Sequence, residues 1–332
     1  MSKLDDEAAA TRLPDEAAGE HDPGPGPDID PAGRAERARR YRFDQESVLA
    51  PLLLAPSIVY IFAMVAIPFV LAITYSVSDV TVGDPSFDFV GLENFRDVLQ
   101  DPVFRRSALN SVGMTLATMI LVVVLAKILA LVLTKDFKGK WVVRFLVLLP
   151  WTTPVSLAAI SWLWMLDTLF SPIDWVLRQM GFIDGSLNWL AKPNLAVISV
   201  VAVQVWRIVP LAAVIIMAGL VAVPQEINDA AAVDGAGFWR TLFSVTIPIT
   251  LPVTAVATLF GAVVVFSDMS IPYVLTRGGP IDATQVLPTW AFFRGIQGGD
   301  LAQGAAVALF ALPLLILMAT LILRSIRRME VT

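Results

Sequence analysis

Six long runs of apolar residues divide the chain, and each is long enough to cross a bilayer. A hydrocarbon core of about 30 Å needs roughly 20 apolar residues in a helix. The runs cover approximately residues 49–77, 108–133, 142–166, 195–221, 249–271 and 303–323. None alternates apolar with polar residues as a barrel strand does, so we expect helices. The pattern predicts an all-α membrane protein with six transmembrane helices.

Composition supports the membrane class and excludes several kinds of chemistry. Hydrophobic residues make up 56% of the chain, more than the roughly 45–50% of soluble domains. There is no cysteine, and the one histidine is His21. Disulfides, thiolate nucleophiles, histidine metal sites and histidine triads are therefore excluded. The apolar runs also lack paired carboxylates, which argues against an integral-membrane enzyme.

The segment before the first apolar run differs from the rest of the chain. Its first 33 residues contain nine acids against Lys3 and Arg12, with many Ala, Pro and Gly and few large apolar groups. Such a composition cannot bury enough apolar surface to fold. We expect residues 1–45 to form a disordered cytoplasmic tail and residues 46–332 to form the transmembrane domain.

Basic residues indicate how the six helices are oriented. Cytoplasmic loops carry an excess of Lys and Arg. The side of the N-terminus has thirteen such residues near the membrane: Arg34, Arg37, Arg39, Arg40, Arg42, Lys135, Lys138, Lys140, Arg144, Arg240, Arg324, Arg327 and Arg328. The opposite side has seven: Arg96, Arg105, Arg106, Arg178, Lys192, Arg277 and Arg294. Both termini are therefore expected in the cytoplasm.

The loop from Pro224 to Pro248 has the pattern of a structured helix–glycine–helix connection, and the charge rule places it in the cytoplasm. Pro224 favours a helix start, and Glu226 and Asp229 favour its positive end. Gly235 supplies the positive φ that ends a helix. A second short run places Phe238, Leu242 and Val245 on one face. We interpret the loop as a rigid docking elbow, with Ile227, Ala230 and Ala231 forming the apolar face of its first helix.

The same loop resembles the cytoplasmic signature of binding-protein-dependent ABC importer permeases. That signature is Glu-Ala-Ala, three residues, Gly, nine residues, then Ile-x-Leu-Pro. In this chain, Asp229-Ala230-Ala231 is followed by Gly235 and then by Val245-Thr246-Ile247-Pro248 at the same spacing. The sugar-permease form, Glu-Ala-Ala-x-x-Asp-Gly-Ala, is matched by Asp229 to Ala236, including Asp234. Asp229 is one methylene shorter than the family's Glu.

Two further stretches resemble carbohydrate-importer permeases. The first stretch resembles the start of the first permease subunit of carbohydrate importers. The matching residues are Leu54-Ala55-Pro56-Ser57, Ile67-Pro68, Tyr75-Ser76 and Val90 to Phe95. Val274 to Pro280 resembles the Leu-Thr-x-Gly-Gly-Pro turn after the fifth helix. Together the resemblance covers residues 49–328 and implies the type I ABC importer permease fold.

The resemblance implies a non-enzymatic permease in the cell membrane that carries a carbohydrate-like solute inward. Its partners would be a second homologous permease, two copies of an ATP-binding subunit and an extracellular solute-binding protein, with no nucleic acid. The coupling residues would be Glu226, Asp229, Ala230, Ala231, Asp234, Gly235, Ala236 and Pro248. The chain lacks Gly-x-x-x-x-Gly-Lys-Ser/Thr, so ATP and Mg²⁺ would be held by the partner ATPase and this chain would carry no cofactor or metal.

Polar residues within the apolar runs are candidates for the solute pathway. A charged group inside a membrane costs free energy, so it is usually present for a function. Asp268, beside Ser267, could accept sugar hydroxyls or could pair with Arg277 or Arg207. Gln204, Trp206 and Arg207 could line the pathway or join helices, and tryptophan suits the flat face of a sugar. Lys127 is closer to the cytoplasmic end of its helix, and snorkelling is the expected explanation there.

Alternatives remain for the solute and for the class of transporter. Glycerol phosphate or a polyol would fit the same motifs, and Arg207 is compatible with a phosphate. An ion-coupled secondary transporter would need a relay of buried acids or histidines. This chain offers one clear intramembrane acid, so that alternative ranks behind the importer.

Overall fold

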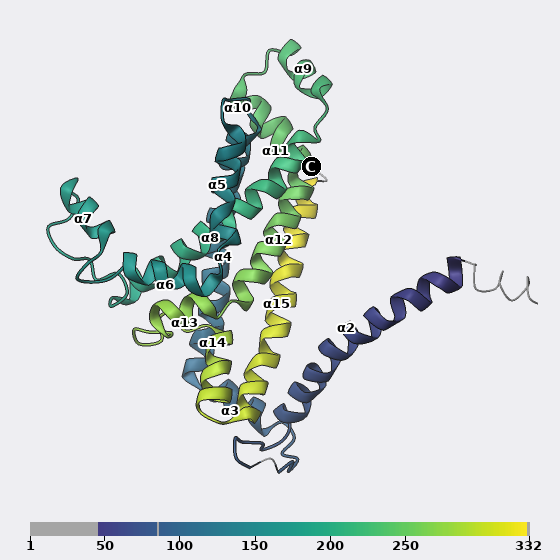
Figure 1. Ribbon diagram of the computed structural model, residues 1–332, viewed down its shortest axis with the longest axis vertical. Coiled ribbons are helices and arrows are strands. Elements are labelled where there is room, and N and C mark those ends of the chain that lie inside the picture. Colours follow the sequence, from purple (N-terminus) through teal and green to yellow (C-terminus); the bar gives the residue numbers. More distant parts are fainter. Residues whose placement is uncertain (1–45, 85, 331–332) are drawn as a thin grey trace, which may run out of the picture. The chain divides into compact units, whose positions relative to one another are not determined.

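The computed structural model describes residues 46–84 and 86–330 (Figure 1). The predicted tail, 1–45, and the Arg34–Arg42 cluster lie outside these residues. The chain divides into two units, Met1–Ala66 and Ile67–Thr332.

The elements are α2 (Glu46–Ser76), α3 (Glu93–Gln100), α4 (Pro102–Thr134), α5 (Lys140–Thr152), α6 (Val155–Met165), α7 (Pro172–Gln179), α8 (Pro193–Val221), α9 (Gln225–Val233), α10 (Phe238–Thr241), the π-helix η1 (Leu242–Thr246), α11 (Ile247–Ile249), α12 (Leu251–Ser267), α13 (Ser270–Thr276), α14 (Leu287–Phe292), the π-helix η2 (Phe293–Gln297) and α15 (Leu301–Glu330).

The predicted all-α membrane architecture is confirmed. In the described part of the chain, four helices are long and apolar enough to cross a bilayer: Leu49–Ser76, Pro102–Thr134, Pro193–Val221 and Leu301–Arg324. Two bent pairs, Lys140–Thr152 with Val155–Met165 and Phe238–Ile249 with Leu251–Ser267, bring the total to six if each counts as one span. Among the described residues the only β-pairing is two isolated bridges, Ser78 with Phe89 and Thr81 with Asp84.

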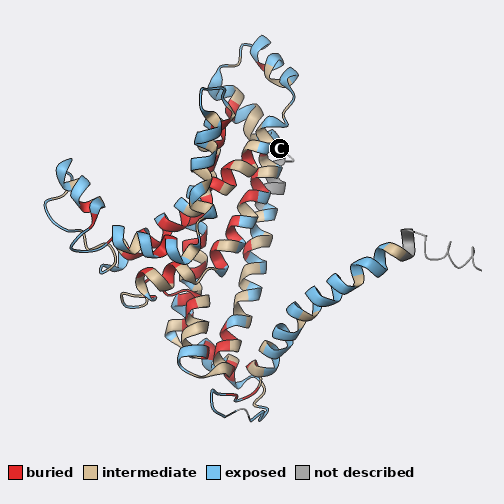
Figure 2. Ribbon diagram, in the orientation of Figure 1, coloured by how far each residue is buried: buried red, intermediate tan, exposed pale blue. Residues whose placement is uncertain are grey.

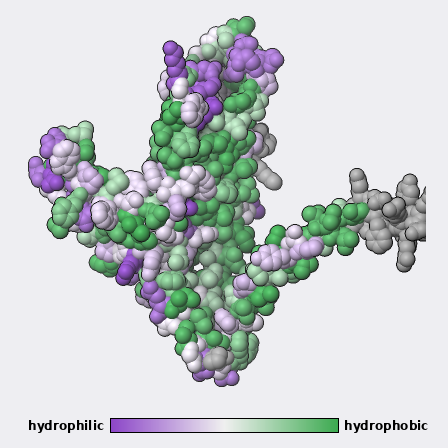
Figure 3. All heavy atoms as spheres, viewed as in Figure 1, coloured by the Kyte–Doolittle hydropathy of each residue, from purple (hydrophilic) through white to green (hydrophobic). Residues whose placement is uncertain are grey.

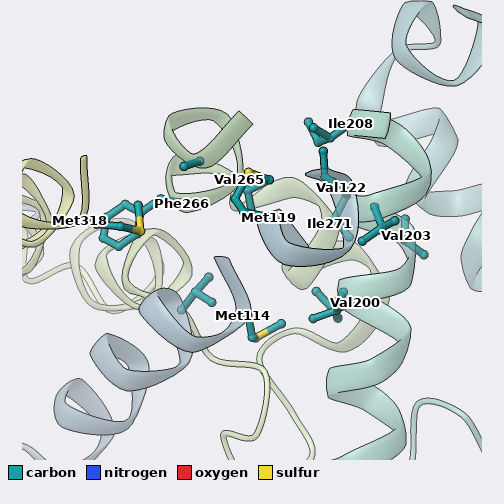
Figure 4. Close-up of a cluster of buried hydrophobic side chains, with 14 of the residues drawn as sticks. Met114, Met119, Val122, Val200, Val203, Ile208, Val265, Phe266, Ile271 and Met318 are labelled. Atoms are coloured by element: carbon teal, nitrogen blue, oxygen red, sulfur yellow. The ribbon is translucent and has the colours of Figure 1, made fainter. Parts of the chain in front are cut away.

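The core of the larger unit forms where α4 packs along α8, with α12 against both. Small side chains bring the first two helices together: Ala126 and Ala130 of α4 and Ala213 of α8 are fully buried. Alanine permits close backbone approach, which drives helix association in lipid, where the hydrophobic effect between helices is absent. Larger side chains such as Met119, Val122, Ile208 and Phe266 fill the remaining space (Figure 4).

Burial and hydropathy are arranged as a bilayer requires. Buried residues concentrate where α4, α8 and α12 meet, whereas the outward faces of these helices are exposed (Figure 2). Those exposed faces are still apolar, and hydrophilic residues gather around α9 and around the α7 loop (Figure 3). Exposed apolar side chains such as Val124, Val256 and Leu317 are typical of a lipid-facing surface.

The third predicted helix, 142–166, is not continuous. Helices α5 and α6 meet at an angle of 94°. The break lies at Thr153 and Pro154, where Pro154 lacks an N–H and disfavours a helical conformation at the residue before it. Thr153 is extended, with ψ of 134°. Both its hydroxyl (2.7 Å) and its backbone N–H (3.0 Å) donate to the carbonyl of Leu149, which closes the end of α5.

The junction between η2 and α15 depends on two glycines in backbone contact. Gly295 and Gly304 are both buried. A Cβ added to Gly304 would lie 2.4 Å from the Cα of Gly295 and 2.8 Å from its nitrogen. No side chain fits there without a shift of the backbone.

We therefore expect Gly304→Ala to lower the free energy of unfolding by ~1–3 kcal/mol, the usual cost of overpacking. Thermal unfolding in detergent, followed by size-exclusion chromatography, measures the change. Gly113→Ala in α4 is the matched control, because nothing lies within 4 Å of its added Cβ. Equal midpoints for the two variants would contradict the tight-contact account.

Candidate functional site

The loop 224–248, called the elbow from here on, begins with a regular helix. Pro224 precedes α9 with φ of −58° and accepts from the N–H of Ile227. The Gln225 amide donates to the Asp229 carboxylate one turn later (3.0 Å), and that carboxylate is exposed. In Figure 1, α9 lies beyond the ends of α8 and α12.

Helix α9 turns one face inward and leaves the other open. Ala231 is buried, and Ile227 and Asn228 are half-buried. Ala230, expected on the apolar inner face, is exposed beside Glu226 and Asp229. This difference arises because a nine-residue helix packs on one narrow stripe. The open face therefore combines acidic and small groups, which suits close approach by another protein chain.

Gly235 ends α9 through a Schellman motif. Its φ is +71°. The N–H of Ala236 donates to the carbonyl of Ala231 (2.9 Å), and the N–H of Gly235 donates to Ala232 (3.1 Å). These two bonds satisfy carbonyls that the helix end would otherwise leave unpaired. The spacing from Ala231 to Gly235 thus fixes the direction in which the chain leaves α9.

The second half of the elbow is irregular and carries exposed aromatic rings. Leu242 is buried and Val245 half-buried, but Phe238, expected on the same face, is 62% exposed. Helix α10 has only four residues before the π-helix η1, which does not follow the 3.6-residue period assumed for one face. Trp239 packs edge-to-face on Phe238 at 5.2 Å and stacks on Phe243 at 6.1 Å. Pro248, in α11, is exposed.

A polar cavity of about 520 Å³ lies between the elbow and the ends of α4 and α8. Its polar lining comes from Thr134, Lys135, Gln225, Asn228, Thr241 and Thr246. The elbow therefore does not pack tightly against the bundle along its whole length.

Within the bundle, the structure brings Gln204 and Asp268 together. The Gln204 amide donates to Oδ2 of Asp268 (2.8 Å). The same carboxylate accepts from the backbone N–H groups of Ser270 (3.1 Å) and Ile271 (3.2 Å). Asp268 thus ends α12 and caps α13, so the predicted continuous helix 249–271 is interrupted there. Negative charge at a helix start is favourable.

Neither arginine pairs with Asp268. The salt bridges among the described residues are Lys140–Asp136 and Arg294–Asp101. The Arg207 guanidinium instead lies over the ring of Trp151, 5.4 Å from its centroid. Its Nε is buried without a hydrogen-bond partner in the described structure, as is the Oε1 of Gln204.

The remaining candidates lie apart from one another. Trp206 is 36% exposed and packs edge-to-face on Trp162 at 5.5 Å. Ser267 is exposed and lines a separate apolar cavity of about 190 Å³ between α12, α14 and α15. The structure therefore groups Gln204 with Asp268, and Arg207 with Trp151 of α5, but not all five candidates at one point.

The expectation that Lys127 snorkels toward the membrane surface is wrong. Its ammonium group donates to the hydroxyl oxygens of Thr250 (2.5 Å) and Thr254 (3.3 Å). The sequence signal that could have identified these partners is the spacing of Thr250, Thr254 and Thr258, which places hydroxyls along one face of a helix.

Comparison with known proteins decides the family. The profile of the family "binding-protein-dependent transport system inner membrane component" matches residues 122–331. The chain belongs to this family. The permease is 31% identical over 285 residues to the sulfoquinovosyl glycerol transport system permease protein SmoG of Agrobacterium fabrum, covering 85% of this chain and 91% of SmoG. It is 30% identical over 272 residues to the trehalose/maltose transport system permease protein MalF of Thermococcus litoralis, covering 82% and 91%.

The fold of the permease also matches a solved structure. A chain of a bacterial ABC transporter involved in the import of the acidic polysaccharide alginate superposes with a TM-score of 0.73 at 17% identity. The match covers 88% of the permease and 99% of that chain. This similarity confirms the predicted type I ABC importer permease fold, and the family confirms a multi-pass membrane permease.

The Schellman motif gives a direct test of the elbow. We expect Gly235→Ala to destabilise the end of α9 by ~1–2 kcal/mol, because a residue with a Cβ is strained at φ of +71°. Amide hydrogen exchange should become faster in residues 225–236. Gly237→Ala is the matched control, since Gly237 has φ of −70° and open space around its Cα. Equal exchange in both variants would rule out the glycine requirement.

Proposed function

We propose that the permease moves a carbohydrate-like solute inward, using ATP hydrolysed by two copies of a separate subunit. A second homologous permease would complete the pathway, and an extracellular binding protein would deliver the solute. ATP and Mg²⁺ would be held by the ATPase subunits, with no cofactor in this chain. Both termini and the elbow would be cytoplasmic, as the basic residues indicate.

The observation that carries the coupling role is the geometry of the elbow. It is a capped helix that presents Glu226, Asp229 and Ala230 outward, with the neighbouring Asp234 also exposed. It continues through η1 and α11 into the membrane helix α12. A push on α9 by a closing ATPase subunit would thus reach the bundle along the chain, through the short helices that connect α9 to α12. Gly235, Ala236 and Pro248 would fix the path of the chain, and Ala231 would anchor it.

A carbohydrate is supported by both the relatives and the polar groups. SmoG and MalF are named for a sulfoquinovosyl glycerol and a trehalose/maltose transport system. The Gln204 Oε1 has no partner in the described structure and could accept a bond from a solute hydroxyl. Asp268 retains further acceptor capacity. Away from this pair, Ser267 would offer a hydroxyl and Trp206 a flat apolar ring at other points of the pathway.

A glycerol phosphate or a polyol is the second candidate solute. The observation that favours an anionic group is Arg207, which has no salt bridge in the described structure and an unpaired Nε. A guanidinium binds phosphate and carboxylate oxygens in a bidentate geometry. Comparing neutral and anionic sugars as ligands of the cognate binding protein distinguishes the two candidates.

The coupling role predicts that Gly235→Pro uncouples the complex. Proline forces φ to about −65° and removes the N–H that caps α9. Loaded binding protein should stimulate ATPase activity in the reconstituted wild-type complex and in Gly237→Ala, but should fail to do so in Gly235→Pro. Stimulated transport by Gly235→Pro at the wild-type rate would refute the coupling role of the elbow.

The pathway role predicts that Asp268→Asn slows uptake about ten-fold, the effect of losing one hydrogen bond to a charged group. Asparagine keeps an oxygen that can cap α13, so the complex should assemble normally. Uptake into proteoliposomes measures the change, and Asp184→Ala, an exposed loop acid, is the control. Unchanged uptake by Asp268→Asn would remove Asp268 from the pathway.

A further inference from the structure

The elbow joins the membrane helix α12 at a sharp bend. The segments Phe238–Ile249 and Leu251–Ser267 meet at 66°. Thr250, at the bend, has ψ of 4° and is 1% exposed. Pro252 has no N–H to donate to the carbonyl of Pro248, so the helical ladder cannot continue across this point. Two prolines, a π-helix and a bend in succession leave the joint without the stiffness of a regular helix.

Side-chain hydrogen bonds hold the bend together. The Thr250 hydroxyl donates to the carbonyls of Thr246 (2.6 Å) and Ile247 (3.3 Å). The Thr254 hydroxyl donates to the carbonyl of Thr250 (2.8 Å). Both hydroxyl oxygens then accept from the ammonium group of Lys127, which comes from α4. A chain of hydrogen bonds thus runs from α4 to the last carbonyls of the elbow.

The ammonium group of Lys127 lies where the end of a helix can stabilise its positive charge. Neither salt bridge of the described residues includes this lysine. The segment Phe238–Ile249 ends at Thr250, and the C-terminal end of a helix carries partial negative charge that stabilises a nearby cation. A charged side chain within a membrane helix costs free energy, so its presence indicates that the residue has a function. Mere attachment of α4 to α12 would not need a charge at the bend.

We propose that Lys127 is a positioning residue that locks the angle between the elbow and α12, so that motion of the elbow moves α4 and α12 together. This inference rests on the proposed function, in which the elbow receives work from the ATPase. In the absence of the ammonium group, the bend would absorb the motion of α9 and little of it would reach the bundle. The elbow would still dock, and the ATPase would still hydrolyse ATP.

The test uses the reconstituted complex with both permeases, the ATPase and loaded binding protein. We expect Lys127→Met to assemble at wild-type yield and keep basal ATPase activity, while stimulation by binding protein falls about ten-fold, which corresponds to the loss of ~1.4 kcal/mol at the bend. Lys127→Arg should restore most of the stimulation, because a guanidinium can reach the same hydroxyls. Lys138→Met, an exposed loop lysine, should behave as wild type.

These outcomes separate the inference from the proposed function. A wild-type complex without stimulation would refute the proposed function itself. A stimulated wild-type complex together with full stimulation in Lys127→Met would overturn only the role of Lys127. A loss of stimulation that Lys127→Arg does not restore at all would also count against a cation-dependent lock.

A distance measurement tests the lock directly, even if Lys127→Met assembles poorly. The chain has no cysteine, so spin labels on Ser244→Cys and Val263→Cys, both exposed positions, report only the bend. Thr250→Val removes one acceptor of the ammonium group at nearly constant volume. We expect one narrow distance distribution with native Thr250 and a broad one with Thr250→Val. Equally narrow distributions would overturn the lock.

Discussion

A helix that is interrupted inside a bilayer must find its own polar partners, because no water is available to the freed backbone groups. Three such interruptions occur among the described residues, and at each one a side chain adds a hydrogen bond to the adjoining backbone. Thr153 bonds to Leu149 at the α5–α6 break, and Thr250 bonds to Thr246 and Ile247 at the start of α12. Asp268 bonds to the N–H groups of Ser270 and Ile271 at its end.

The interruptions lie where the permease has to do more than cross the membrane. The break at Thr250 connects the elbow to α12, and the break at Asp268 forms the polar pair with Gln204. Between them, α12 is a regular helix packed on α4 and α8. The alanine contacts of α4 and α8 supply a rigid frame against which the interrupted segments can be positioned. The regular, tightly packed helices and the interrupted segments thus lie in different parts of the same bundle.

Much of the fold could be predicted from local pattern. The six apolar runs follow from hydropathy alone, since the bilayer requires long apolar stretches wherever the chain crosses. The turn at Gly235 could be predicted because a positive φ favours glycine whatever lies nearby. Which side chains of the elbow are buried could not be predicted in the same way. Ala230 and Phe238 are exposed although a 3.6-residue period places them inward. A short α9 and a π-helix decide those faces, and neither can be derived from periodicity.

The candidate polar groups show the same division. Sequence identified Gln204, Arg207 and Asp268 as residues that need a partner, because burying a charge or an amide in a membrane is costly. It did not identify the partners, since Asp268 lies 64 positions from Gln204, and Lys127 lies 123 positions from Thr250.

The sequence by itself therefore determined the membrane class, the capped elbow and the family, because those properties depend on runs and spacings of neighbouring residues. Only the tertiary structure decided which polar groups meet, where the helices bend and which face of the elbow is open. Those outcomes depend on how helices distant in the sequence pack: Gln204 of α8 and Lys127 of α4 both find their partners on or beside α12.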